Sequence, residues 1–190
     1  VDMVLYPDNE NIGEGGYYPT LSNVFTSKNG SKVTVNDITF TGTGYFVSAG
    51  DYSPEARKTA ITEFNNVNII DMELLQFGKW CTALNTCGTA YLNNCHVYGS
   101  SRSPLDEDYN NPDASPVYDF VVSNSCKTYI NGGKIGSIYL DNAAIVEVVG
   151  AEIDAIYSEA RGTRYLQIGS NAHVKKVVAS RADVRIIDVN

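Results

Sequence analysis

The chain of 190 residues lacks the long apolar run that a membrane-spanning helix requires, which is about 18 consecutive residues. It also lacks a charged and then apolar segment at its start of the kind that directs secretion, so no targeting signal indicates a localisation. Residues 1–6 already alternate like a strand, and residues 185–189 form another strand-like run. We therefore expect no membrane insertion, and we expect the chain to be a fragment of a longer protein.

Positive charge is scarce, because 14 basic residues face 22 acidic ones and the net charge is −8. The longest basic run is the pair Lys175 and Lys176, whereas binding to nucleic-acid phosphates requires clusters of lysine and arginine. The glycine-rich segment at residues 13–16 lacks the lysine and the following helix of a phosphate-binding loop. These absences argue against nucleic acid as a partner.

Cysteine and histidine are also few. The four cysteines have no zinc-binding spacing, and the two histidines have no visible nucleophilic partner, so we expect neither a metal nor a cofactor. Two interpretations of the cysteines stay open. We favour free buried thiols over a disulfide framework, because three of the four lie in apolar, strand-like surroundings.

The abundant residues are those of a turn-rich β protein, with 18 asparagines, 16 glycines and 13 tyrosines. A spacing pattern repeats although no run of identical residues does: an apolar or small residue at position zero is followed by others at +2, +5 and +7. Looser or partial units begin at 128, 166 and 184. The complete units are Val33, Val35, Ile38 and Phe40; Val67, Ile69, Met72 and Leu74; Ala90, Leu92, Cys95 and Val97; and Val146, Val148, Ala151 and Ile153.

This spacing predicts a sharp corner within each unit. Side chains of a strand alternate between its faces, so the odd step from +2 to +5 returns the second pair to the same interior only if the chain bends between them. Glycine, asparagine and aspartate tolerate the left-handed backbone that such a corner requires. The residues at +4 are Asp37, Asp71, Asn94, Gly132, Gly150, Ser170 and Asp188.

The units start at residues 33, 67, 90, 128, 146, 166 and 184, which indicates a core repeat of about 18–23 residues with inserted loops. Residues 137–140, 155–158 and 177–180 are candidates for a third strand in each repeat. Three strands per turn, stacked about 4.8 Å apart, form a parallel β-helix. The rival fold is a β-sandwich, which would favour two-residue hairpin turns that are rare in this sequence.

The sequence therefore predicts an all-β protein, a right-handed single-stranded parallel β-helix that occupies residues 1–190 as one domain. Residues 1–28 are expected to be irregular and residues 29–190 to form the coils. Asn29, Asn124 and Asn142 each precede a position zero by four residues, so we expect them to stack in a column at a corner. Loop insertions are expected at about residues 42–62 and 99–117, and Ser53, Pro54 and Glu55 open a short helix in the first insertion.

Loops of different length on a rigid scaffold are where binding residues are usually presented, so the insertions supply the candidate site. The candidate catalytic carboxylates are Asp106, Glu107, Asp51 and Glu55, since glycoside cleavage needs two carboxyl groups about 5–10 Å apart. The alternative, which we favour, is that an acidic loop tip is simply hydrated. The candidate substrate-binding residues are Trp80, Tyr98, Arg102, Tyr109 and Tyr118, although the aromatic ones could instead cover the edges of the coils.

Residues 33–40 and 67–74 resemble coils of the pectate-lyase-like right-handed parallel β-helix superfamily. The resemblance covers roughly residues 29–190 and consists of spacing and turn residues; the aspartate clusters of its lyases and polygalacturonases have no match here. Short irregular coils resemble the phage tailspike and neck-appendage members, which implies a homotrimer that binds or cuts a surface polysaccharide. Parallel packing of three chains would use the outward-facing Tyr129, Tyr139, Tyr157 and Tyr165.

Three functions follow from this resemblance as expectations. The first is a virion tailspike or appendage component that binds, and in some cases depolymerises, a host surface polysaccharide. The second is a secreted polysaccharide lyase or hydrolase, and the third is a structural module of a bacterial adhesin. A virion location accompanies the first function and an extracellular location accompanies the second.

Overall fold

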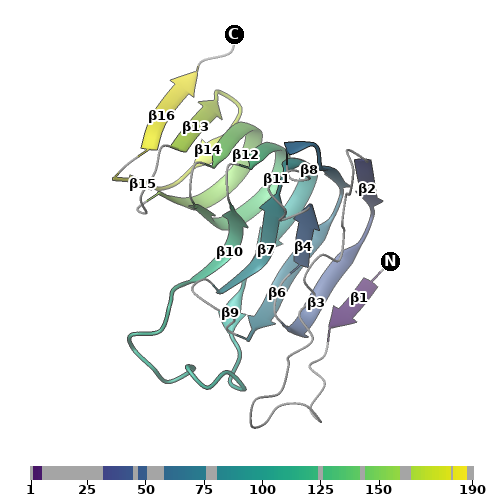
Figure 1. Cartoon of the computed structure of the whole chain (residues 1–190), viewed down its shortest axis with the longest axis vertical. Coiled ribbons are helices and arrows are strands. Elements are labelled where there is room, and N and C mark those ends of the chain that lie inside the picture. The colour runs from purple at the N-terminus through teal and green to yellow at the C-terminus, as the bar shows by residue number, and fades with distance from the viewer. Residues whose placement is uncertain are drawn as a thin grey trace.

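The computed structural model describes residues 2–5, 32–44, 47–50, 58–75, 81–123, 126–141, 144–158, 164–180 and 182–187. Within these residues the protein is nearly all β, as the sequence predicts, and the strands belong to one curled sheet (Figure 1). Each strand pair is parallel, and the strands follow one another from β1 near one end of the molecule to β16 near the other. Parallel pairing without hairpins excludes the β-sandwich alternative.

Three columns of stacked strands make up the sheet. The first column contains β2 (Lys32–Asn36), β5 (Ile61–Asn65), the first parts of β8 (Thr89–Tyr98), β11 (Lys127–Leu140) and β12 (Ile145–Ser158), and then β13 (Arg164–Gly169) and β16 (Ala182–Ile187). Each strand hydrogen-bonds to its counterpart one repeat further along the chain. The column therefore aligns side chains from seven successive passes of the backbone.

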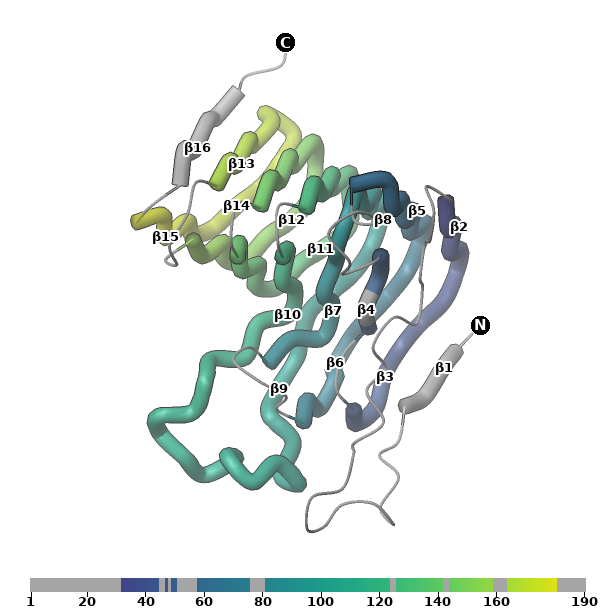
Figure 2. The backbone as a smooth tube through the Cα atoms, in the orientation of Figure 1, coloured from purple at the N-terminus to yellow at the C-terminus, as the bar shows by residue number. Residues whose placement is uncertain are grey.

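The second and third columns are built in the same way. The second contains β1 (Asp2–Leu5), β3 (Thr39–Gly44), β6 (Asn68–Leu74), the last part of β8, the middle parts of β11 and β12, and β14 (His173–Val174), with β9 (Ser101–Arg102) beside the end of β6. The third contains β4 (Val47–Gly50), β7 (Cys81–Cys87), β10 (Val117–Val122), the ends of β11 and β12, and β15 (Val177–Ala179). Figure 2 shows how the backbone bends as it passes from one column into the next.

One apolar core lies inside the curl of the sheet, between the three columns. Residues at equivalent positions stack on one another; most of the inward side chains are buried, and a few, such as Val33 and Val174, are only partly buried. Burying an aliphatic side chain of this size contributes about 1.5–3 kcal/mol, so these stacks hold the columns together. The three principal stacks are Phe64, Leu92, Ile130, Val148 and Ile168; Ile69, Val97, Ile135 and Ile153; and Leu84, Phe120, Ile138 and Ile156.

The structure corrects the register of the second repeat. Thr62 and Phe64 pair with Ala90 and Leu92, so this repeat starts at residue 62 and not at residue 67. Val67 and Ile69 are its +5 and +7 residues and belong to the second column. The sequence pattern passed over Thr62, a polar residue that is 1 % exposed in the structure, and took the next apolar pair, Val67 and Ile69, as the start of the repeat.

The predicted corner is present in four successive repeats. Asp37, Asn66, Asn94 and Gly132 have positive φ values of 56°, 53°, 50° and 81°. Asp71 also has a positive φ, but it lies inside β6 and not at this corner. The prediction is wrong for Gly150 and Ser170, which do not adopt positive φ, and Asp188 lies outside the described residues.

Side-chain hydrogen bonds form two adjacent ladders at this corner. The Nδ2 atoms of Asn66 and Asn94 donate to the Oδ1 atoms of Asp37 and Asn66 over 3.0 and 2.9 Å. Asn36, Asn65 and Asn93 form the second ladder, with distances of 2.9 and 2.8 Å. The column predicted for Asn29, Asn124 and Asn142 falls outside the described residues; the amide ladders lie at the +3 and +4 positions instead.

The insertions are only partly described. Residues 42–44 and 47–50, expected in the first insertion, lie in β3 and β4, and residues 51–57, which include most of the expected short helix, are outside the described part. The second insertion leaves the second column after β9 and returns at β10, so residues 103–116 form a loop. The right-handed winding into a three-sided helix stays a prediction.

We predict that Asn66→Ala destabilises the protein more than Asn66→Gly, by about 1–2 kcal/mol, because alanine carries the steric cost of a left-handed backbone and glycine does not. Both variants remove the amide from the ladder, so their difference isolates the backbone term. Urea unfolding followed by circular dichroism measures it. Equal free energies of unfolding for the two variants would show that the corner is not held in this conformation.

A matched pair of glycines tests the close approach of neighbouring repeats. At Gly133, φ is 85° and an added Cβ would lie 1.9 Å from the carbonyl oxygen of Cys95, whereas at Gly150 the nearest atom would be 3.5 Å away. Gly133→Ala should therefore cost more than the ~1–2 kcal/mol of the backbone conformation alone. Gly150→Ala should stay within about 0.5 kcal/mol of the parent protein in the same urea experiment. Similar losses for both would contradict the stacking described for this repeat.

Candidate functional site

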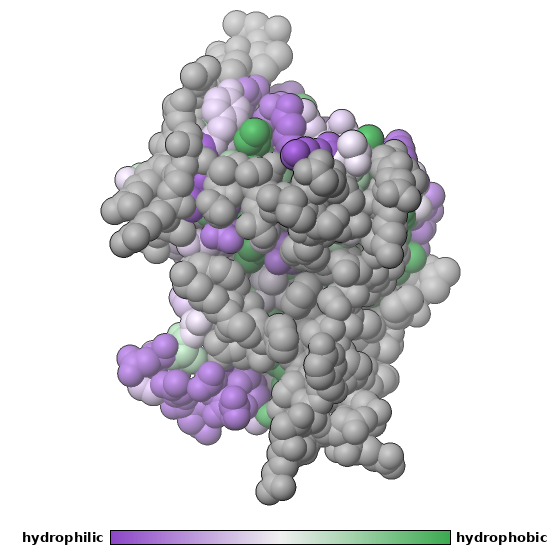
Figure 3. All heavy atoms as spheres, viewed as in Figure 1, coloured by the Kyte–Doolittle hydropathy of each residue, from purple (hydrophilic) through white to green (hydrophobic). Residues whose placement is uncertain are grey.

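The loop between β9 and β10 carries several of the predicted site residues. It projects from the body of the sheet (Figure 1) and its visible surface is mostly hydrophilic (Figure 3). At its base, Asp119 is 8 % exposed and accepts hydrogen bonds from the backbone N–H groups of Ser100 and Ser137 over 2.9 and 2.7 Å. These bonds fix the loop to the second and third columns.

Asp106 anchors the interior of this loop. Its Oδ2 accepts a hydrogen bond from Nη1 of Arg102 at 2.8 Å, and its Oδ1 accepts one from the backbone N–H of Asp108 at 2.8 Å. The two side chains of the ion pair are only 10 % and 2 % exposed, and Arg102 also donates to the carbonyl oxygen of Ser115. A carboxylate held in this way orders the loop, because both of its oxygens accept hydrogen bonds from the same segment.

Of the other predicted catalytic carboxylates, one lies in the described part of the chain. Glu107 is exposed, and Asp51 and Glu55 lie outside the described residues. An acid or base role for any of the four stays a prediction.

The predicted aromatic binding residues have different surroundings. Tyr118 is 6 % exposed, and its ring centroid lies 4.8 Å from that of Tyr139 and 5.6 Å from that of Tyr157. Contacts within the protein therefore cover this ring. Tyr98 is half-buried beneath the ammonium group of Lys134, Tyr109 is 49 % exposed on the loop, and Trp80 lies outside the described residues.

The tyrosines expected to join three chains do not form one column. Tyr139 and Tyr157 lie on the third column with Tyr118, and Tyr139 is 2 % exposed. Tyr129 and Tyr165 lie on the first column instead. Because the four tyrosines lie on two columns, they do not form the single face that was expected to join three chains. The homotrimer itself stays a prediction.

The cysteines are free and buried, as favoured from the sequence. Burial raises the pKa of Cys81 to about 12, an effect that the charge of Arg102 opposes and that of Asp106 reinforces. Burial likewise raises the pKa of the Cys95 thiol to about 11, against hydrogen bonds at the backbone of Val67 and Asn93. Both groups are neutral thiols near pH 7 and are therefore poor nucleophiles.

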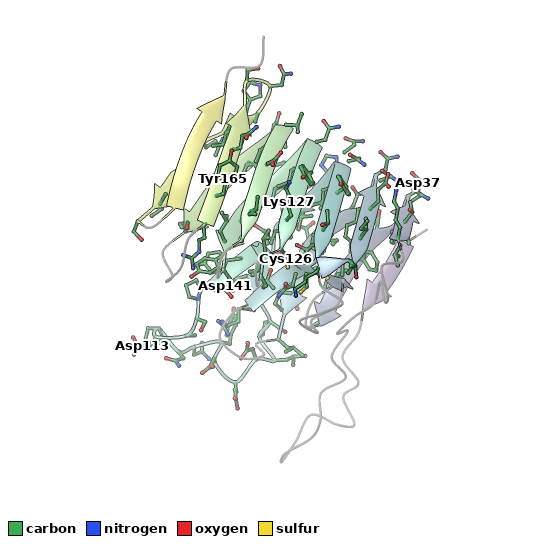
Figure 4. The ribbon with its side chains drawn as sticks, turned by 45° about the horizontal axis from the view of Figure 1, so that its top comes forward. Asp37, Asp113, Cys126, Lys127, Asp141 and Tyr165 are labelled. Carbon is green, nitrogen blue, oxygen red and sulfur yellow. The ribbon has the colours of Figure 1, made fainter. Side chains whose placement is uncertain are left out.

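The outer face of the first column carries an aromatic pair that the sequence reasoning missed. Tyr91 and Tyr129 occupy equivalent positions on β8 and β11, and their rings stack with centroids 4.9 Å apart and planes within 7° of parallel. The Lys127 ammonium lies 4.8 Å from the Tyr129 ring centroid and pairs with Glu147 on the following strand at 3.7 Å. Figure 4 shows Lys127 and Tyr165 on this upper face of the molecule.

A shallow hollow of about 340 Å³ adjoins Tyr91 on the same face. Its lining consists of Lys32, Ile61, Glu63, Tyr91 and Asn93, which come from three successive strands of the column. Tyr91 is 37 % exposed, which is high for so large an aromatic side chain. The hollow thus combines one aromatic ring with a cation, a carboxylate and an amide.

The charges beside the hollow are paired. Glu63 forms an ion pair with Lys32, and this hydrogen-bonded ammonium is the main reason that the pKa of Glu63 lies below its usual value. Lys127 has a raised pKa, chiefly because of its hydrogen bond with Tyr129. Lys127 and Glu63 are therefore ionised near neutral pH, and the surface is polar without a strong net charge.

This arrangement can bind a small polar ring but offers little for catalysis. Aromatic faces attract the apolar faces of ligands, and the flanking polar groups can hydrogen-bond to hydroxyl groups. Alternation along the strand would have placed Tyr91 outward, one position after Ala90, as it did Tyr129. To find the hollow from the sequence, the corrected register was also needed, because it alone places Glu63 beside Tyr91.

The described part of the chain contains no helix long and apolar enough to cross a bilayer. Its histidine, cysteine, aspartate and glutamate side chains form no group of three or more that could hold a metal ion. Comparison of the chain with protein-family models, curated proteins and solved structures finds no match.

We predict that Asp106→Asn destabilises the loop strongly, because it removes the carboxylate charge that pairs with the nearly buried Arg102. Breaking a buried ion pair costs about 3–5 kcal/mol, and the partial exposure of Arg102 places the expected loss at or below the lower end of that range. Limited proteolysis of residues 103–116 and urea unfolding measure the effect.

The neighbouring substitution Glu107→Gln is the matched control. Its side chain is exposed, so its free energy of unfolding should change by no more than about 0.5 kcal/mol. If Asp106→Asn were as stable and as resistant to proteolysis as this control, the ion pair would not be what orders the loop.

Proposed function

We propose that the three columns are the faces of a right-handed parallel β-helix with three strands per coil. The proposal is supported by the fixed order of the columns along the chain and by the parallel register within each. A connection between parallel strands of one sheet is almost always right-handed, which favours this winding over its mirror image.

On this scaffold we propose that the protein binds a polysaccharide, as a component of an elongated appendage of the phage-tailspike kind. The observation that carries the proposal is the hollow beside Tyr91, in which one exposed aromatic ring adjoins the Lys32–Glu63 pair and the amide of Asn93. A sugar ring has an apolar face that can stack on the tyrosine and hydroxyl groups that can bond to the polar side chains. The outer face of a regular sheet holds these groups rigidly, which limits the entropy lost on binding.

The proposed activity is binding without cleavage at this hollow. Glycoside hydrolysis uses two carboxyl groups about 5–10 Å apart, and Glu63 is the single carboxylate among the described residues that line the hollow. Glu63 is also held ionised by Lys32, which makes it a poor general acid.

The partner in this proposal is a host surface polysaccharide and the place of action is the outside of a virion. A net charge of −8 suits a soluble surface that does not adhere to nucleic acid. Detection of cleavage products would instead favour the alternative function, an extracellular enzyme.

The test is binding to an array of bacterial capsular and lipopolysaccharide-derived polysaccharides. We predict that Tyr91→Ala lowers the affinity for the polysaccharide that is bound by about tenfold or more, equivalent to the loss of ~1.4 kcal/mol. Tyr109→Ala is the control, because Tyr109 is also an exposed tyrosine but lies on the loop and not in the hollow.

Circular dichroism establishes that both variants remain folded. If Tyr91→Ala kept full affinity and Tyr109→Ala lost affinity, the binding site would be on the loop. Release of shorter fragments from the polysaccharide would show a depolymerase.

A further inference from the structure

The orientation of the tyrosine rings indicates which part of a glycan the hollow can accept. The Tyr91 and Tyr129 rings are nearly parallel and come from neighbouring strands, so their faces are directed along the column and not away from the sheet. A sugar chain lying along the outer face of the column would meet the ring edges. Only a ring that continues the stack can meet a tyrosine face.

The two stacked rings have four faces, and three of these faces are covered by a neighbouring group. Tyr91 and Tyr129 cover one face of each other, and the Lys127 ammonium lies over Tyr129 where it also reaches Glu147 on the following strand. The hollow lies on the opposite side of Tyr91, because its other lining residues come from β2, β5 and β8 and not from β11. The remaining face of Tyr91 therefore borders the hollow.

The described walls of the hollow lie toward the sheet and at its two ends along the column. Below it is the backbone of β5, which carries Ile61 and Glu63, and beyond that strand lies the pair of Glu63 with Lys32. A volume of about 340 Å³ is at the small end of ligand pockets, which span roughly 300–1,000 Å³. The outward side, away from the sheet, is the side that these residues leave for a linkage from a sugar stacked on Tyr91 to further sugars.

We infer that the hollow recognises a single terminal sugar residue of a glycan, inserted edgewise against Tyr91, and not the interior of a linear chain. This inference rests on the proposed function. An internal residue has two linkages, and edgewise insertion would direct one of them into β5. The terminal residue has one linkage, which points to solvent.

Hydrogen-bonding groups flank the inserted ring. Asn93 uses one Nδ2 proton in the amide ladder, and a carboxamide has a second proton and a carbonyl oxygen that can bond hydroxyl groups without breaking the ladder. Lys32 and Glu63 present a donor and an acceptor that already neutralise each other. A neutral hexose or deoxyhexose fits these groups better than a uronic acid, which would bring a carboxylate toward Glu63 and a protein of net charge −8.

The experiment uses competition against the polysaccharide that the array identifies, with the complete chain immobilised. The competitors are methyl glycosides of glucose, galactose, mannose, rhamnose and N-acetylglucosamine, with methyl glucuronide as the acidic comparison. We expect one neutral methyl glycoside to compete with an affinity within about threefold of that of a tetrasaccharide ending in the same sugar, a difference below ~1 kcal/mol. Removal of that terminal sugar by an exoglycosidase should abolish binding.

Two variants separate this geometry from a chain lying along the column. Tyr91→Ala should weaken the methyl glycoside and the tetrasaccharide equally, and Gln167→Ala should weaken neither, because Gln167 lies three strands further along the same face. An affinity that rises about tenfold or more from the methyl glycoside to the tetrasaccharide, together with a loss in Gln167→Ala, would overturn the inference while the proposed function stood. Stronger competition by methyl glucuronide than by any neutral glycoside would overturn the choice of a neutral sugar. Absence of polysaccharide binding altogether would overturn the proposed function itself.

Discussion

Parallel backbone hydrogen bonding between successive repeats is the constraint on which the remaining structure depends. It places residues at the same position of each repeat about 4.8 Å apart, in columns that run the length of the sheet. Each position must then suit the same position one repeat earlier and one repeat later. The apolar stacks, the amide ladders and the aromatic pair are three results of this one geometry, at the inner face, the corner and the outer face.

The corner shows how the constraint selects particular residues. A side chain that tolerates positive φ and also bonds to its own copy in the next repeat satisfies both requirements, and asparagine does so at Asn66 and Asn94. At the following repeat the corner changes to Gly132 and Gly133, where the close approach of Cys95 leaves no space for a side chain on Gly133. Later corners, at Gly150 and Ser170, do not use the left-handed conformation at all. The backbone thus makes the same bend with different conformations at successive corners.

The outer face is where the constraint can serve binding. Stacking holds Tyr91 and Tyr129 in fixed planes without burying them fully, and the Lys32–Glu63 pair is fixed by the register of β2 on β5. The third column uses its outer tyrosines differently, since Tyr118 and Tyr139 are buried in a second apolar cluster. Tyrosines on the outer faces of the first and third columns therefore have different surroundings, and their exposure distinguishes them.

The sequence by itself determined the β class, the inward positions of most repeats and the preference for small polar residues at the corner, because alternation and backbone tolerance are local properties of a strand and a turn. It did not determine the register at Thr62, since a buried threonine is not distinguishable from an exposed one in the sequence. It also could not select Tyr91 among 13 tyrosines or show that Asp106 is bound to Arg102. Those facts depend on which strands lie side by side and which loop folds back on itself, and only the tertiary structure decides these long-range contacts.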